Sequence, residues 1–147
     1  DIVVNRHEFA TVEERVRAIQ DETLGGHGAD VVIATAGVPE SIPEGIDFVR
    51  YGGRFCEAGH FADSGSVLLN PSRHFCSKSI TLVGSWSSEP EHFARALAIM
   101  ERREYPLGDL ISHRISVEQT EDAFRALASN YLLNDREVIK AAVAPWN

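Results

Sequence analysis

The sequence has few of the features that mark specialised classes of protein. It contains two cysteines in 147 residues, which make no disulfide framework, so a reducing cytoplasm is the default expectation. No apolar run approaches the roughly 20 residues of a membrane span, and no basic-then-apolar leader pattern is present. The formal net charge of -8 argues against a nucleic-acid surface, which needs clustered cations. We therefore expect a cytoplasmic protein with no membrane and no nucleic-acid partner.

The remaining composition is that of a soluble globular protein. Hydrophobic residues make up 44% of the chain and charged residues 24%, and the length suits one domain with a real core. The chain starts at Asp1 without methionine, directly before the apolar run Ile2-Val3-Val4. A strand that starts so abruptly predicts a truncated or processed product.

Short apolar runs rich in β-branched residues alternate with amphipathic patterns from Ile2 to Met100. This rhythm predicts βαβ units and a parallel sheet with helices on both faces. The first helix is the best marked, because Thr11 and Glu14 have the spacing of a capping box and Gly25–Gly28 can end the helix. The expected strands are 2–4, 30–34, 54–58 and 79–84, and the expected helices are 12–23, 39–50 and one from residue 88, with a helical turn at 71–75.

The last part of the chain departs from this rhythm. Residues 111–115 predict a strand, residues 116–129 a capped helix, and residues 138–143 a terminal strand.

Ligands in a doubly wound sheet bind beyond the carboxyl ends of the strands. Three small-residue loops follow expected strands: Thr35–Gly37, Gly59–Phe61 and Ser85–Ser87. Small residues there let a flat ligand approach the backbone, although they also simply permit tight turns, and the pattern alone leaves both readings open. The phosphate-binding pattern G-x-G-x-x-G is missing, and Gly25–Gly28 is no substitute because it follows a helix instead of opening one.

No metal-binding or catalytic motif stands out. Cys56 with His60, and His74 with Cys76, are only pairs, whereas a zinc site needs three or four convergent ligands. Trp86 either stacks on a ligand or fills a sheet edge, and the pattern favours the second reading.

Segments spread over essentially the whole chain resemble the medium-chain zinc-type alcohol dehydrogenase superfamily. They are Gly28–Ile33, Thr35–Gly37, Val49–Phe55, Gly59-His60, Asn70-Pro71, Ile80–Trp86, Asp109–Arg114, Glu118–Phe124 and Ile139–Ala141. The resemblance implies an α/β fold: a partial doubly wound, Rossmann-like parallel sheet whose first βαβ unit is missing. Residues 1–110 would be a partial dinucleotide-binding domain, and residues 111–147 a C-terminal segment that packs on the catalytic domain in relatives.

The resemblance also implies which residues meet the cofactor, NAD or NADP in the parent enzyme. The nicotinamide carboxamide would contact backbone groups at Ala58, Gly84 and Trp86, and Lys140 would reach the pyrophosphate. The glycine loop, the ribose-reading acidic residue and the zinc ligands would lie upstream, so we expect no catalytic residue and no metal in this chain. The expected cofactor-binding residues are Thr35, Ala36, Ala58, Gly59, Gly84, Trp86 and Lys140.

The strand order of that fold, 3-2-1-4-5-6, leaves two strands of this chain without neighbours. Residues 2–5 would pair only with a strand outside the chain, and the strand at 30–34 would expose an apolar edge. We expect either an N-terminal part beyond this chain or edge pairing with another copy. Strands near Leu68 and at 80–84 match the edge through which relatives dimerise, so a homo-oligomer is also expected.

The leading hypothesis is that the parent is a nicotinamide-dependent oxidoreductase moving hydride between an alcohol and its carbonyl compound, and that the isolated chain is inactive. The alternative is a non-catalytic module for dimerisation or weak nucleotide binding. An unrelated α/β binding domain is disfavoured by the spread of the matching segments.

Overall fold

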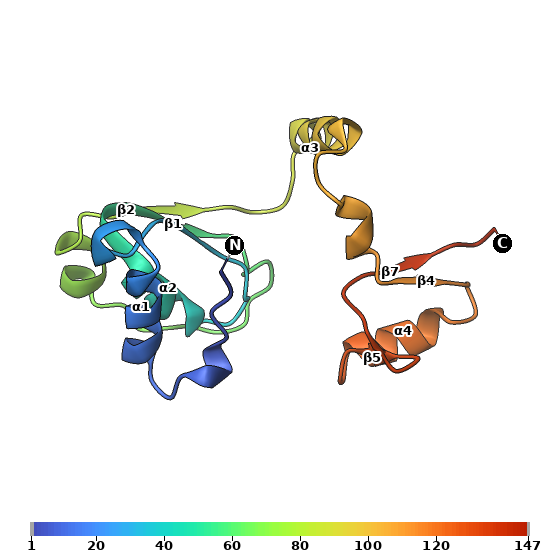
Figure 1. Ribbon diagram of the computed structural model, residues 1–147, viewed down its shortest axis with the longest axis horizontal. Coiled ribbons are helices and arrows are strands. Elements are labelled where there is room, and N and C mark those ends of the chain that lie inside the picture. Colours follow the sequence, from blue (N-terminus) through green and yellow to red (C-terminus); the bar gives the residue numbers. More distant parts are fainter. Residues whose placement is uncertain (1, 147) are drawn as a thin grey trace. The chain divides into compact units, whose positions relative to one another are not determined.

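The computed structural model describes residues 2–146 and divides by internal contacts into two compact units. Unit 1 is Asp1–Ser87 and unit 2 is Ser88–Asn147. Both are shown in Figure 1. The expected boundary at residue 110 is defined differently, as the start of a segment that packs on a catalytic domain in relatives. It therefore stays a prediction.

Unit 1 is built on a three-stranded parallel sheet. Its strands are β1 (Ala29–Ala34), β2 (Val49–Glu57) and β3 (Thr81–Gly84), in the order β1-β2-β3. Pairing is parallel throughout, with Val32 opposite Phe55 and Phe55 opposite Leu82. The predicted α/β class and parallel sheet are therefore confirmed. Parallel strands need crossovers, which are supplied by helix α2 (Ser41–Phe48) and, in the second connection, by the helical turn η3 (Ser72–Cys76).

The first helix, α1 (Val12–Asp21), begins where the capping box predicts. The Thr11 side chain accepts from the Glu14 amide at 3.2 Å, and the Glu14 carboxylate accepts from the Thr11 amide at 3.1 Å. A short 3-10 turn, η1 (Arg6–Glu8), precedes the helix, and another, η2 (Leu24–Gly26), follows it. Gly25 in η2 has a φ of 70°, so the glycine turn ends the helix as expected.

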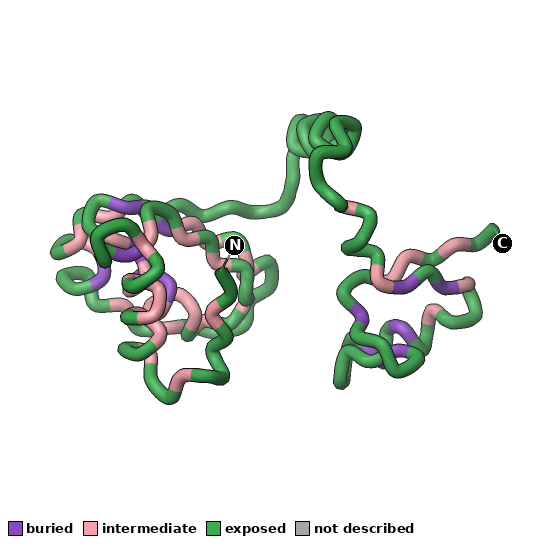
Figure 2. The backbone as a smooth tube through the Cα atoms, in the orientation of Figure 1, coloured by how far each residue is buried: buried purple, intermediate pink, exposed green. Residues whose placement is uncertain are grey.

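The core of unit 1 lies between the sheet and α2. Ile46, Val49 and Phe55 are fully buried there. Buried parts of the chain are purple in Figure 2. The helix approaches the strand so closely that a Cβ placed on Gly45 would lie 2.6 Å from the Phe55 ring. Glycine at this position therefore sets the distance between α2 and β2.

One expectation for unit 1 is wrong. Residues 2–5 form no strand, because a strand needs a hydrogen-bonded partner and no described segment pairs with them. The expectation of helices on both sheet faces stays a prediction, because within unit 1 helices cover one face only and the helix after β3, α3 (Pro90–Arg102), belongs to unit 2. On the face away from the core, Val31, Ile33 and Val83 are 54%, 64% and 46% exposed. The reason is that the second connection is a single turn, which supplies no helix for that face.

Unit 2 has its own smaller core. Strands β4 and β7 pair in parallel, β5 and β6 form an antiparallel hairpin, and Ile115, Ala123, Ala126, Leu133 and Val138 are buried together. Its elements are α3 (Pro90–Arg102), η4 (Leu107–Leu110), β4 (His113–Ile115), α4 (Thr120–Leu127), β5 (Leu132–Leu133), β6 (Arg136–Glu137) and β7 (Ala141–Val143).

The order of strand, helix and strand in unit 2 matches the sequence expectation, but the bounds differ. The capped helix expected from residue 116 begins at Thr120, because the Ser116 amide is engaged by the Gln119 side chain at 3.1 Å in a turn before the helix. Within residues 2–146, every helix is too short or too polar to cross a membrane.

Candidate functional site

The carboxyl ends of the three strands of unit 1 are tied into one continuous edge. The Ala58 amide, just beyond β2, donates to the Ala34 carbonyl at the end of β1, at 2.9 Å. The Ser85 amide, just beyond β3, donates to the Glu57 carbonyl at 2.8 Å. Each loop therefore leaves the sheet beside the end of its neighbour, and we refer to this surface as the carboxyl edge.

The loops after β1 and β2 touch each other through glycine. A Cβ placed on Gly59 would lie 2.6 Å from the Gly37 amide nitrogen and 2.9 Å from that of Ala36. Gly37 itself has a φ of 67°, in the left-handed region that favours glycine. Ser64 adds a hydrogen bond from its hydroxyl to the Gly37 carbonyl at 3.2 Å. The two loops thus contact backbone to backbone, with no side chain between them.

The structure brings six of the seven expected cofactor-binding residues to the carboxyl edge. Five of them are exposed there, and Gly59 is half-buried against the neighbouring loop. The seventh, Lys140, precedes β7 in unit 2, where its amide donates to the Ser112 hydroxyl at 3.1 Å. The six residues at the edge are Thr35, Ala36, Ala58, Gly59, Gly84 and Trp86. This placement leaves their role in cofactor binding as a prediction.

A carboxylate–imidazole pair at the same edge was missed by the sequence analysis. Glu57, the last residue of β2, accepts three hydrogen bonds at Oε1: from the Gly59 amide at 2.7 Å, the His60 amide at 3.1 Å and His60 Nδ1 at 2.9 Å. The available signal was a glutamate closing an apolar strand, followed three residues later by histidine across an Ala-Gly turn.

The hydrogen bonds of Glu57 control its protonation. Burial raises the pKa of the Glu57 carboxyl, but the bonds from His60 and from the Gly59 and His60 amides outweigh that effect, so the pKa lies below its usual value. The carboxylate is therefore ionised at neutral pH. Glu57 Oε2 and His60 Nε2 are both buried and have no hydrogen-bond partner within residues 2–146.

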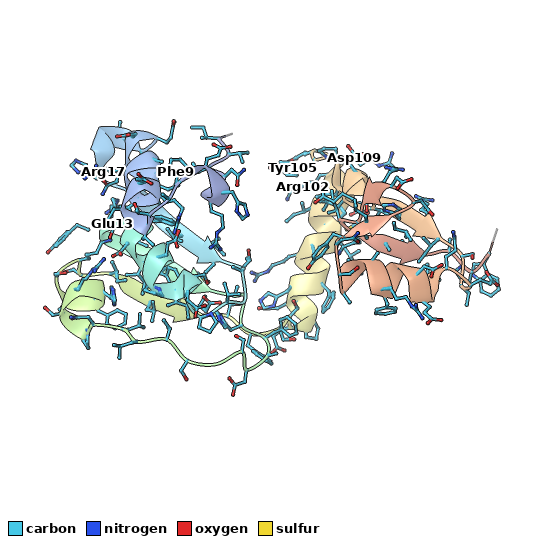
Figure 3. All side chains as sticks on the ribbon, turned by 90° about the horizontal axis from the view of Figure 1, so that it is seen from below. Phe9, Glu13, Arg17, Arg102, Tyr105 and Asp109 are labelled. Atoms are coloured by element: carbon cyan, nitrogen blue, oxygen red, sulfur yellow. The ribbon has the colours of Figure 1, made fainter. Side chains whose placement is uncertain are left out.

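Elsewhere the described residues offer less for chemistry. No three His, Cys, Asp or Glu side chains in residues 2–146 lie close enough together to hold a metal ion. Cys56 and Cys76 are both free thiols. A polar hollow in unit 1 is lined by Glu13 and Arg17, which project from α1 (Figure 3), and by Asp47 and Arg73. Arg73 and Asp47 already form an ion pair at 2.6 Å, so neither of these two residues presents an unpaired charge to the hollow.

Comparison with known families gives one clear match. The family model for zinc-binding dehydrogenases matches residues 1–102, well over half of the chain.

Individual relatives agree with that match. A 5-exo-hydroxycamphor dehydrogenase from Pseudomonas putida is 30% identical over 125 residues, which is 84% of this chain and 34% of the relative. A sorbitol dehydrogenase from Halalkalibacterium halodurans is 27% identical over 135 residues, which is 92% of this chain and 37% of the relative. The chain thus spans about a third of the length of the curated relatives it matches.

Solved structures show the same relationship. An alcohol dehydrogenase from Thermotoga maritima superposes with a TM-score of 0.84 at 29% identity, covering 97% of this chain and 37% of that one. A 2R,3R-butanediol dehydrogenase from Bacillus subtilis gives a TM-score of 0.74 at 21% identity, covering 98% of this chain and 38% of that one, and shares the fold.

Proposed function

The chain belongs to the zinc-binding dehydrogenase family, and from that premise we propose that it supplies the nicotinamide side of the cofactor pocket in a zinc-type, NAD(P)-dependent alcohol dehydrogenase. The observation that carries the proposal is the carboxyl edge, where three parallel strand ends are hydrogen-bonded side by side. In open α/β sheets, ligands bind beyond this end of the strands.

The residues at the edge fit a flat amide-bearing ring. Ala58 and Gly84 have little or no side chain, and both are exposed, so a ring can approach their backbone groups closely. The carboxamide then exchanges hydrogen bonds with backbone groups of Ala58, Gly84 and Trp86, while Thr35 and Ala36 line the cleft. Lys140 belongs to unit 2, and the family resemblance alone supports its proposed contact with the pyrophosphate.

When bound, the nicotinamide would supply the hydride chemistry, and zinc held by residues outside this chain would supply polarisation of the substrate oxygen. The residues of this chain bind the ring and fix its orientation, and they supply no catalytic group. The substrate class that we propose is a small alcohol, including sugar alcohols such as those named for the sorbitol and D-arabinitol dehydrogenases among the relatives. On this proposal the 147 residues alone do not oxidise alcohol, and activity of the isolated chain would contradict it.

We also propose a cytoplasmic, self-associating parent protein. The two free cysteines suit a reducing compartment. The β3 edge, where Leu82 and Val83 are about half exposed, offers a strand edge to a second copy.

A non-catalytic module is the second candidate, and the exposed sheet face of unit 1 favours it. Val31 and Ile33 present apolar surface that an association module would bury. In that case the chain dimerises without any response to the cofactor.

Titration of the isotope-labelled chain with the reduced dinucleotide tests the proposal. Because only part of the pocket is present, we expect binding no tighter than about 1 mM, near -4 kcal/mol, in calorimetry. In NMR spectra, the amide signals of Gly59, Gly84 and Trp86 should shift while those of α4 in unit 2 stay unchanged. Micromolar affinity would show that the pocket is complete without an upstream half. Shifts that avoid the carboxyl edge would contradict the site.

A further inference from the structure

The Glu57–His60 pair has two polar atoms for which the fold provides no partner. Glu57 Oε2 and His60 Nε2 are both shielded from solvent and unbonded. Leaving buried polar atoms unpaired costs free energy, so such atoms call for an explanation. Each side chain as a whole is about one-fifth exposed, 19% for Glu57 and 18% for His60, so the pair lies just beneath the surface.

Glu57 Oε2 is a hydrogen-bond acceptor, and His60 Nε2 is one when the imidazole is neutral. Oε2 belongs to an ionised carboxylate, which has no proton to donate. His60 Nδ1 lies 2.9 Å from Oε1, and two acceptors do not bond, so Nδ1 carries the proton. In the neutral imidazole, Nε2 then presents a lone pair. With a neutral imidazole, the pair suits a ligand that brings two donors.

Backbone contacts fix the position of the Glu57–His60 pair at the carboxyl edge. The backbone carbonyl of Glu57 accepts from Ser85 at the end of β3, and Gly59, between the two side chains in sequence, contacts the loop after β1. The pair thus belongs to the middle strand of the carboxyl edge, with the other two strand ends on either side.

We propose that Glu57 and His60 form an acceptor site for two neighbouring hydroxyl groups of the ligand bound at the carboxyl edge. This inference rests on the proposed function. A phosphate is repelled by the carboxylate, and the carboxamide already has backbone partners in the proposed pose. A vicinal diol supplies two neighbouring O–H donors, one for each acceptor, and because both acceptors are shielded the proposal includes a side-chain rotation that exposes Oε2 and Nε2.

Two molecules offer such a diol: the ribose attached to the nicotinamide, and a polyol substrate. Both present the same chemistry, and a titration distinguishes them. The 147-residue chain, with nitrogen-15 in its histidine rings, is titrated separately with nicotinamide riboside, with nicotinamide and with sorbitol, each up to its solubility limit. The His60 ring signals and the backbone amides of the edge are followed together.

We expect the His60 ring nitrogens to shift with nicotinamide riboside and not with nicotinamide, which lacks the ribose. A shift with sorbitol instead assigns the diol to the substrate, and a shift with both ranks the two by affinity. If nicotinamide riboside moves the Gly84 and Trp86 amides while neither diol moves His60, the inference is overturned and the proposed function survives. If nothing at the edge responds, both fail.

The variant Glu57→Gln replaces one acceptor oxygen by an amide group of the same shape. Loss of a hydrogen bond to a charged group weakens diol binding by about tenfold or more. The matched control is Glu91→Gln on α3, which alters another Glu–His neighbour pair, 3.8 Å apart and largely exposed. An equal effect of the two variants would overturn the inference, and the comparison of ligands on the unmodified chain stands even if Glu57→Gln fails to fold.

Discussion

Substitution of Gly59 by alanine tests whether the contact between two backbones holds the carboxyl edge together. The new Cβ would lie 2.6 Å from the Gly37 nitrogen, 2.8 Å from the Thr35 carbonyl carbon and 2.9 Å from the Ala36 nitrogen. All three atoms belong to the backbone, so no side chain can turn away to relieve the overlap. The two loops must separate by roughly 1 Å to restore ordinary contact, and overpacking of this kind typically costs about 1–3 kcal/mol.

Gly84→Ala is the matched control, because nothing lies within 4 Å of a Cβ at Gly84 and its φ is not in the left-handed region. Native-state hydrogen exchange of the β1 and β2 amides reports unit 1 separately from unit 2. We expect Gly59→Ala to lower the free energy of opening by about 1–3 kcal/mol, and Gly84→Ala to change it by less than about 0.5 kcal/mol. Equal protection in the two variants would refute the close contact.

Three further outcomes are expected. Arg15→Ala should lower the thermal midpoint of unit 1 more than Arg125→Ala lowers that of unit 2. The Arg15 side chain is only 12% exposed and makes two hydrogen bonds to Glu44, at 2.5 and 3.0 Å. Arg125 makes only an exposed surface ion pair, which contributes little to stability. Glu57→Gln should destabilise unit 1 at neutral pH in urea unfolding. Because the folded pKa of Glu57 is lowered, this difference should shrink as the pH falls below the ordinary value of 4.5, and a constant difference would contradict the assignment. Ser112→Ala should destabilise unit 2 by about 1–2 kcal/mol, measured by hydrogen exchange, because its hydroxyl accepts from the Ile139 and Lys140 amides.

The parts of the fold that were predictable depend on local chemistry. The capping box of Thr11 and Glu14 needs only four adjacent residues, and it forms as the spacing indicates. The runs that became β1 and β3 are apolar and β-branched over consecutive positions, which is typical of strands in parallel sheets.

The parts that failed depend on partners distant in the sequence. Residues 2–4 have the composition of a strand, but composition cannot supply the neighbour that a strand requires. The hairpin of β5 and β6 turns at Asn134 and Asp135, whose φ angles of 51° and 58° are those of a two-residue turn. Asn-Gly or Asp-Gly would have indicated this turn, whereas Asn-Asp marks it only weakly.

The candidate site also has a part that could be predicted from the sequence and a part that could not. Small residues after each strand could be recognised along the chain, because the carboxyl ends of parallel strands share one edge. The Glu57–His60 pair could not be recognised, since its interest lies in two atoms that find no partner after the chain has folded. Only coordinates show which polar atoms a fold leaves unsatisfied.

The exposed sheet face of unit 1 carries apolar residues of β1. Val32 and Ala34 of β1 contact the core under α2, whereas Val31 and Ile33 point away from it and are more than half exposed. A strand with one solvated face normally alternates apolar with polar residues, and β1 does not. The sequence of β1 is therefore that of a strand covered on both faces.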